Sequence, residues 1–412
     1  MWMNLMDSIA RRLCKVGELG LTYPNGETRT YGSGGDLTAA MTIRTNAALR
    51  KLCIRPELAL GEGYMDGSIV LDGIDELEKL LTLLLRNRRP NSFPAYLRLL
   101  NWLNYRARGL KHRNTAQSAK ANVAHHYDLS DDLYRLMLDD DMQYSCAYFH
   151  QPTLDLEAAQ LAKKRHIAQK LLLQKDCHVL DIGCGWGGMA LTLASEFDVR
   201  VTGVTLSENQ LATAQDRARE RGLSDRVTFR LIDYRKLNET FDRIVSVGML
   251  EHVGLPHYTE FFSQVANLLA PDGIALIHTI GRVCPPRVTS PWINKYIFPG
   301  GYIPSLSELM PAIESSGLWQ ADIEIWRRHY ALTLREWRRR FASNIEQIRV
   351  WYDDRFIRMW NYYLTACILA FEEQEQAVYQ LQLSHNRDSV PITRAYLYQP
   401  SPLHEWSQHT GG

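Results

Sequence analysis

The chain has 412 residues, of which 45% are hydrophobic and 23% are charged. This length exceeds what one hydrophobic core usually serves, so we expect one large domain and one smaller domain. The 47 basic and 46 acidic residues give a net charge of +1, so charge gives no argument for a nucleic-acid partner. Any anionic partner has to be bound by a local patch.

The seven cysteines are widely spaced, and no two of them form a Cys-x-x-Cys pair. This pattern favours free thiols in a reducing cytoplasm over disulfides or a zinc site, and we expect no metal. The N-terminal stretch breaks its apolar run with Asp7, Arg11 and Arg12, which is not typical of a signal peptide. The most apolar run, residues 80–85, is far shorter than the ~20 residues that cross a bilayer. We therefore expect a cytoplasmic protein.

Residues 1–107 are expected to form a small α+β domain that is associated with lipid or substrate. Residues 21–28 predict a hairpin, because Asn-Gly in this stretch supplies the positive φ angles of a tight turn. A second strand is predicted over 39–45. The leucine spacing over 74–85 marks one face of a helix. Basic and small polar residues without apolar periodicity predict a linker over 108–122.

Residues 123–395 are expected to form the larger, catalytic domain, with a tail over 396–412. Its near-continuous apolar strands alternate with helices, which predicts an α/β fold of Rossmann-like type with a mostly parallel sheet covered on both faces. A ligand is then expected at the carboxyl ends of the strands. The predicted strands are 179–183, 200–206, 227–233, 241–249 and 274–280, and the predicted helices are 189–197, 208–222 and 257–270.

A glycine-rich loop, Asp181-Ile182-Gly183-Cys184-Gly185-Trp186-Gly187, follows the first of these strands and opens a helix. Glycines there let the backbone approach a ligand closely. A dinucleotide site is one alternative, but it requires a third glycine three residues after the second and an acid at the end of the second strand. Here Gly187 follows Gly185 by two residues, and the second strand ends in Thr205-Leu206-Ser207. A merely tight turn is the other alternative.

This loop resembles motif I of S-adenosylmethionine-dependent methyltransferases, and further motifs narrow the resemblance. From about residue 20 to about residue 385 the chain is similar to the cyclopropane-fatty-acyl-phospholipid synthase family, which is related to the mycolic acid cyclopropane synthases. The matching blocks are 61–67, 126–129, 144–149, 205–210, 249–254, 278–281 and 296–304.

The resemblance implies a class I methyltransferase domain and a specific reaction. A methylene group passes from S-adenosylmethionine to the cis double bond of an unsaturated acyl chain in a phospholipid, through a carbocation that a bound bicarbonate deprotonates. An alkene is a weak nucleophile, so the site has to position its π electrons in line with the sulfonium methyl. It also has to exclude water, which would trap the cation as an alcohol.

The resemblance places the bicarbonate cradle at five residues that can bind or orient an oxyanion. Tyr330 and His278 offer donors, and Glu251 can orient the ion or share its proton. Taken singly, Glu251 also fits a solvated loop residue and His278 a core histidine. The set is Cys146, Glu251, His278, Ile280 and Tyr330.

Cys146 has two alternative roles, as a nucleophile or as a metal ligand. No second thiol or metal-type cluster accompanies it in the sequence, and methyl transfer to an alkene needs no covalent enzyme intermediate. We therefore expect Cys146 to help seat the anion.

The cofactor residues that the resemblance implies lie beside the glycine loop and at the ends of neighbouring strands. Gln210 offers amide donors and an acceptor, and Tyr234 could flank the adenine, with core packing as the alternative. Asp233 is the alternative contact for the adenine amino group. The set is Tyr144, Ser145, Asp181, Gly183, Gly185, Thr205, Leu206, Gln210, Asp233 and Tyr234.

The resemblance also implies a homodimer and peripheral contact with the inner face of the membrane. Basic stretches at 97–113 and 335–340 are the candidate lipid-facing segments. Two other functions stay open: formation of a methyl- or methylene-branched chain with the same cofactor, and lipid binding with a degenerate nucleotide site. The complete set of predicted site residues favours ring closure over both.

Overall fold

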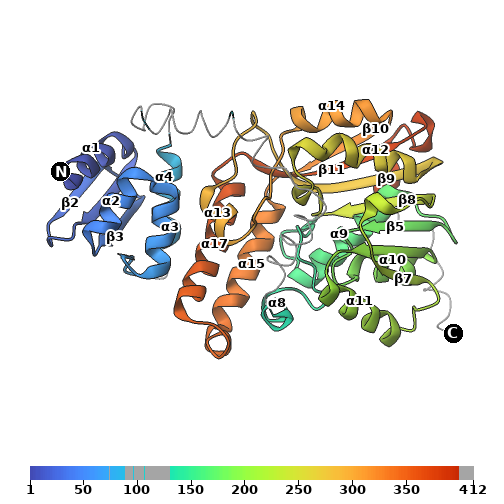
Figure 1. Ribbon diagram of the computed structural model, residues 1–412, viewed down its shortest axis with the longest axis horizontal. Helices are drawn as coiled ribbons and strands as arrows, with labels where there is room; N and C mark the ends of the chain where they lie inside the picture. Colours follow the sequence, from blue (N-terminus) through green and yellow to red (C-terminus); the bar gives the residue numbers. More distant parts are fainter. Residues whose placement is uncertain (74, 89–95, 97–105, 107–129, 399–412) are drawn as a thin grey trace. The chain divides into compact units, whose positions relative to one another are not determined.

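The computed structural model describes residues 1–73, 75–88, 96, 106 and 130–398 (Figure 1). The predicted linker, and nearly all of the predicted tail and of the 97–113 stretch, lie outside these residues. Contacts divide the chain into two compact units. Segments 287–299 and 334–375, which the sequence placed in the catalytic domain, group with the N-terminal region. The first unit is 1–111, 287–299 and 334–375, and the second is 112–286, 300–333 and 376–412.

The first unit contains a four-stranded sheet in the order β2-β1-β3-β4. Strands β1 (Gly17–Thr22) and β2 (Thr28–Gly34) form the predicted hairpin, with Gly26 at φ +85° in its turn. The second predicted strand is confirmed as β3 (Thr38–Ile43), and β4 (Ile69–Val70) pairs with it. The helices in the described residues of this unit are α1 (Trp2–Leu13), α2 (Asn46–Ile54), α3 (Pro56–Asp66), α4 (Glu76–Arg86), α13 (Pro291–Tyr296), α16 (Ile345–Ile348) and α17 (Asp354–Glu372).

Three arginines of the 335–340 cluster, Arg335, Arg338 and Arg339, are ion-paired within this unit. Arg335 contacts Glu78 at 2.8 Å and Glu372 at 2.6 Å, and Arg338 contacts Glu78 at 2.6 Å. Paired charges attract an anionic surface less than free ones, because the field of each arginine is partly cancelled by its partner. The structure therefore weakens the interpretation of this cluster as a lipid-facing patch.

The second unit contains a seven-stranded sheet in the order β10-β11-β9-β8-β5-β6-β7. Strands β5 to β9 confirm the five predicted strands and pair in parallel, whereas β11 is antiparallel to both β9 and β10. The strands are β5 (His178–Ile182), β6 (Arg200–Thr205), β7 (Val227–Leu231), β8 (Phe241–Val247), β9 (Leu269–Arg282), β10 (Trp319–Trp326) and β11 (Gln376–Ser384).

The helices of this unit confirm the three predicted ones as α10, α11 and α12, and α15 continues from this unit into the first. The helices are α8 (Asp131–Met137), α9 (Leu156–Leu171), α10 (Gly188–Phe197), α11 (Glu208–Glu220), α12 (Tyr258–Leu268), α14 (Leu306–Ser316) and α15 (His329–Ser343). Single turns of 3₁₀ helix lie at Tyr234–Lys236, Leu250–His252, Leu255–His257, Arg387–Ser389 and Arg394–Leu397.

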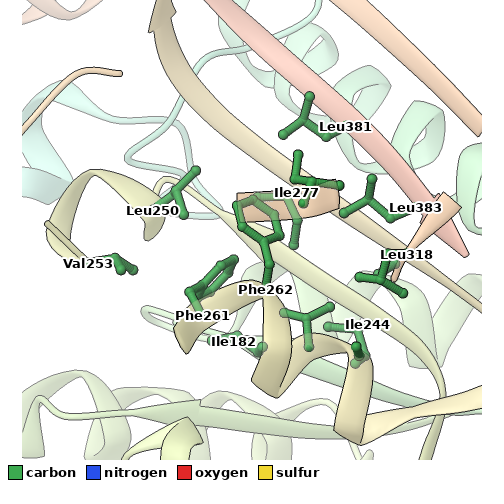
Figure 2. Packing of buried hydrophobic residues seen from close by; sticks show 14 of the residues in the cluster. Ile182, Ile244, Leu250, Val253, Phe261, Phe262, Ile277, Leu318, Leu381 and Leu383 are labelled. Atoms are coloured by element: carbon green, nitrogen blue, oxygen red, sulfur yellow. The ribbon is translucent and has the colours of Figure 1, made fainter. Parts of the chain in front are cut away.

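Helices cover both faces of the large sheet, as the sequence predicts. On one face α12 and α14 pack on the strands, and Phe261 and Phe262 belong to the same apolar cluster as Ile244 and Ile277 (Figure 2). On the other face α9, α10 and α11 form a second core around residues such as Leu191. Sheets buried on both faces leave only their edges and strand ends for binding.

The strand order changes direction at β5, which has β6 on one side and β8 on the other. In open α/β sheets the ligand crevice lies at such a point, outside the carboxyl ends of the strands. No helix among the described residues is long and apolar enough to cross a membrane. All seven cysteines lie in described segments, and none of them forms a disulfide.

Candidate functional site

The glycine loop adopts backbone angles that side chains disfavour. Gly183, Gly185 and Gly187 have φ angles of +84°, +53° and +84°. The amides of Gly183 and Cys184 both donate to the carbonyl of Val204, at 2.9 and 3.0 Å, which fixes the loop to the end of β6. A Cβ on Gly187 would lie 2.6 Å from the Phe229 ring, whereas a Cβ on Gly185 would meet no protein atom within 4 Å. The space over Gly185 is therefore open.

A cavity lies at the carboxyl ends of β5, β6 and β8, next to this loop. Its empty volume, including space that opens to solvent, is about 840 Å³. Seven of the predicted cofactor residues line it, together with apolar residues that the sequence did not single out, such as Ile232 and Met249. The seven are Gly183, Gly185, Thr205, Leu206, Gln210, Asp233 and Tyr234.

The polar groups of the cavity wall are oriented by hydrogen bonds. Thr205 donates to the Gln210 amide oxygen at 3.3 Å, and the Ser207 hydroxyl caps α11 by accepting from the Gln210 amide nitrogen of the backbone. Arg235 donates to both carboxylate oxygens of Asp233, at 2.9 and 2.6 Å. Burial raises the pKa of Asp233, but these Arg235 hydrogen bonds outweigh it and hold the pKa below its usual value. Asp233 is thus an ionised acceptor.

The other three predicted cofactor residues do not line this cavity. Tyr144 and Ser145 lie beside the glycine loop, and Asp181 is its first residue. Tyr144 packs edge-on against Tyr134, whose ring lies 5.2 Å from that of Trp186 in the glycine loop. Ser145 follows Tyr144 and is half-buried. Asp181 is fully buried at the end of β5, and its Oδ2 has no hydrogen-bond partner. Burial raises the pKa of Asp181 to about 7.

Glu251 and Ile280 meet where β9 runs past the end of β8. Just after β8 ends, the Gly248 amide donates to the His278 carbonyl at 2.9 Å. The next amide on that side of β9 belongs to Ile280, and it donates to Glu251 Oε1 at 2.6 Å. The second oxygen, Oε2, is buried and has no protein partner. Burial raises the pKa of Glu251 to about 7, although the Ile280 hydrogen bond opposes it. The carboxyl group can thus gain or lose a proton near neutral pH.

His278 is 3% exposed and lies on β9 between β8 and β11. The amide nitrogen of Gln380 lies 3.1 Å from His278 Nδ1; because this nitrogen only donates, Nδ1 accepts and the ring proton lies on Nε2. Burial, with the charges of Lys163 and Lys170, holds the pKa of His278 well below its usual value. The ring is therefore neutral, with one N–H to donate.

Cys146 lies in a segment that docks on the first turn of α15. The amide of Ala147 donates to Thr333 Oγ1 at 3.0 Å, and the amide of Phe149 donates to His329 Nδ1 at 3.2 Å. Tyr330, half-buried, lies between these two positions on α15. Cys146 is fully buried, and burial raises the pKa of its thiol. A protonated thiol is a poor nucleophile, which agrees with a seating role for Cys146.

The predicted cofactor residues and the predicted anion-binding residues lie close to one another. A Cβ on Gly183 would lie 3.0 Å from Met249, two residues before Glu251. His278 packs edge-on against Trp326 at 5.3 Å, and Trp326 stacks on Tyr148, two residues after Cys146, at 4.7 Å. Among the described residues, no group of three or more His, Cys, Asp or Glu side chains is arranged to hold a metal ion.

Comparisons with known proteins agree with this geometry. Residues 114–381 match the family model of mycolic acid cyclopropane synthetase, and residues 2–93 match a domain of unknown function. The chain belongs to the mycolic acid cyclopropane synthetase family. It is thus an S-adenosylmethionine-dependent methyltransferase, and the predicted family, fold class and enzyme class are confirmed.

Relatives in this family carry different product names. The chain is 40% identical over 353 residues to the cyclopropane-fatty-acyl-phospholipid synthase of Escherichia coli K12. The aligned region covers 85% of this chain and 89% of that protein. The chain is 33% identical over 392 residues to the tuberculostearic acid methyltransferase of Mycobacterium tuberculosis, covering 92% and 90%. The solved mycolic acid cyclopropane synthase CmaA1, in complex with SAH and CTAB, matches with a TM-score of 0.61 and 34% identity, covering 64% of this chain and 97% of that one.

Two glycine substitutions in the loop have different expected effects. Gly185→Ala should mainly weaken cofactor binding, and Gly187→Ala should mainly weaken folding. Gly185→Ala adds a methyl group where no protein atom lies nearby, so we expect the protein to fold with a loss of about 1–2 kcal/mol from the positive φ. Its affinity for S-adenosylhomocysteine, measured by calorimetry, should fall at least tenfold. Gly187→Ala should unfold more easily than Gly185→Ala, because it drives Cβ into Phe229. Cofactor affinity that is unchanged in Gly185→Ala would contradict the placement of the site.

Glu251→Gln should separate stability from function. In the wild type the folded-state pKa of about 7 exceeds the usual 4.5, so the folded state binds more protons and loses stability as pH rises from 4.5 to 7. The variant lacks this loss. We expect it to be more stable than the wild type at pH 8 by on the order of 1–3 kcal/mol, with the difference shrinking toward pH 4.

Denaturant unfolding at both pH values measures this difference, with the exposed carboxylate variant Glu314→Gln as the control. A wild type that is more stable than Glu251→Gln at pH 8 would show that the Glu251 carboxylate is well solvated or paired.

Proposed function

We propose that the protein is a cyclopropane-fatty-acyl-phospholipid synthase that uses a bound bicarbonate as its base. One observation carries the proposal: the carboxyl group of Glu251 is buried, with one oxygen bound to the Ile280 amide and the other without a protein partner. Ile280 lies two residues after the neutral His278 on β9, and Met249 and His252 on either side of Glu251 line the neighbouring cavity. Such a pocket suits a small oxyanion that both accepts and donates hydrogen bonds.

The residues present fit bicarbonate. A Glu251 that holds a proton near neutral pH can donate it to an anion, and the Nε2–H of His278 supplies a second donor. The family resemblance adds the Tyr330 hydroxyl and the backbone around Cys146 to this set. Bound there, bicarbonate supplies a weak base that takes one proton from the newly attached methyl group. Burial keeps bulk water from reaching the same position.

The residues of the neighbouring cavity fit S-adenosylmethionine. Ionised Asp233 can accept from hydroxyl or amino groups, and the open surface over Gly185 admits close approach of a polar chain. Apolar residues such as Ile232 and Val253 offer flat contacts for an adenine ring. When bound, the cofactor would supply the activated methyl group, and Asp233, Gln210 and the glycine loop would hold it.

The partner and location that we propose rest on the family resemblance. The substrate is a phospholipid with unsaturated acyl chains, so the enzyme has to reach lipid at the inner face of the membrane as a peripheral protein, and the family suggests a homodimer. A second product remains a specific candidate, because a relative of this chain is named a tuberculostearic acid methyltransferase. In that case a hydride shift would move the cation to the methyl-bearing carbon, and loss of a proton from the methyl group would leave a methylene branch. A saturated methyl branch would require a further hydride donor, such as a reduced nicotinamide cofactor of a second protein.

Expression in cells that contain unsaturated phospholipids tests the proposal. We expect mass spectrometry of the fatty acids to show products that are heavier than the unsaturated precursors by one methylene group, and NMR to show cyclopropane protons. The matched control is cells expressing the Glu251→Gln variant, which should accumulate little product. Vinylidene signals, or a saturated methyl branch, would assign the protein to the second product class. Unchanged fatty acids with intact cofactor binding would contradict both.

A further inference from the structure

A lysine that the proposed reaction does not use is hydrogen-bonded to the predicted cofactor residue Ser145. Lys163, on α9, is 0% exposed. Burying an ammonium group is costly unless hydrogen bonds and charges compensate for the lost water. An apolar side chain would fill the same place on a core helix at lower cost, so the presence of a cation there calls for a specific role.

The hydrogen bonds of Lys163 identify the segment that it holds. Its Nζ donates to Gln143 Oε1 at 2.6 Å and to Ser145 Oγ at 2.8 Å. One turn earlier on α9, Gln160 donates to the backbone carbonyls of Gln143 and Ser145, at 3.1 and 3.0 Å. Lys164 binds Asp141 at 2.5 Å. Helix α9 thus holds residues 141–145 by three side chains.

The direction of these hydrogen bonds matters for the cofactor. The charged form of Lys163 only donates, so in that form Ser145 Oγ accepts from Lys163 and its own proton is free to point elsewhere. The Gln143 amide is fixed in the same way, because its oxygen accepts from Lys163 and its nitrogen donates to Asp141 Oδ2 at 3.1 Å. Lys163 therefore makes Ser145 a hydrogen-bond donor and places a positive charge directly behind it.

We propose that Lys163 is a positioning residue for the cofactor: through Ser145 it presents a donor, backed by a buried positive charge, to the carboxylate of the cofactor's methionyl end. This inference rests on the proposed cofactor role of Ser145. Lys163 contacts Ser145 and not the cofactor itself, so it affects cofactor affinity rather than the chemical step. Burial lowers the pKa of Lys163 to about 7, partly offset by the charge of Asp139, so its charge changes within the working pH range.

The groups that act electrostatically on Lys163 come from several elements. Asp139 and Asp141 favour its charged form, and Lys164 disfavours it. Lys163 in turn acts on two buried groups at strand ends, Asp181 and His278. The ionisable neighbours are Asp139, Asp141, Cys146, Lys164, Asp181 and His278.

A double-mutant cycle tests whether Lys163 acts through Ser145. The dissociation constant of S-adenosylhomocysteine is measured by calorimetry on the full-length chain for the wild type, Lys163→Met, Ser145→Ala and the double variant. We expect each single change to weaken binding about tenfold and the double variant to bind no more weakly than the singles, because one interaction is lost in all three. A double variant weakened about a hundredfold would overturn the proposal. A wild type that does not bind would instead overturn the cofactor site itself.

A pH series separates this role from simple packing. Between pH 7 and 9 the wild-type affinity should fall severalfold, because the carboxylate of the ligand favours the protonated lysine. Lys163→Gln keeps a neutral donor for Ser145 without the ionising amine, so its affinity should fall less over the same range. The amino group of the ligand titrates equally in both experiments, so its effect cancels when the pH profiles of the wild type and Lys163→Gln are compared. Identical pH profiles would overturn the proposal.

A matched control on the same helix is Lys170→Met. Lys170 is also 0% exposed, but it pairs with Glu324 at 2.5 Å and does not contact the 141–145 segment through any described contact. We expect this variant to lose stability in a thermal melt while keeping the wild-type affinity and pH profile for S-adenosylhomocysteine. Equal losses of affinity in Lys170→Met and Lys163→Met would show a structural effect and overturn the proposal.

Discussion

Loss of water around the ionisable groups at the carboxyl ends of the central strands is the constraint on which the site depends. Asp181, Glu251 and Lys163 all have pKa values near 7 because burial disfavours their charged forms. The same burial keeps His278 neutral and the Cys146 thiol protonated. A pocket of weak acids and bases without a strong nucleophile is what a reaction through a carbocation requires, because strong nucleophiles and water would both trap the cation.

The fold creates this environment through strand length. Strand β8 ends at Val247, whereas β9 continues to Arg282, so the Ile280 amide has no ladder partner on the β8 side and Glu251 accepts its hydrogen bond instead. The three adjacent strands β8, β5 and β6 end at the glycine loop and the cavity beside it. The carboxyl end of the sheet therefore holds side by side the groups that we propose for cofactor binding and for proton removal.

Much of this arrangement could be predicted from the sequence, because period and turn chemistry are local. Apolar runs gave β5 to β9, and Gly183, Gly185 and Gly187 marked the loop. Helix α9 was missed because Lys163, Lys164 and Lys170 look like a solvent face, whereas the structure buries all three. Strands β10 and β11 were missed because their antiparallel pairing with β9 is a long-range property. The hydrogen bond between Glu251 and Ile280 depends on tertiary contacts that no local pattern contains.

The most direct test of the central claim is the dependence of turnover on bicarbonate. The purified enzyme is assayed on unsaturated phospholipid vesicles with S-adenosylmethionine, in buffer freed of carbon dioxide and then titrated with bicarbonate at constant pH. A pocket built for a small oxyanion predicts at least a tenfold loss of turnover in the depleted buffer and saturable recovery as bicarbonate is added. Full turnover in the depleted buffer would contradict the account and assign proton removal to a side chain of the protein itself.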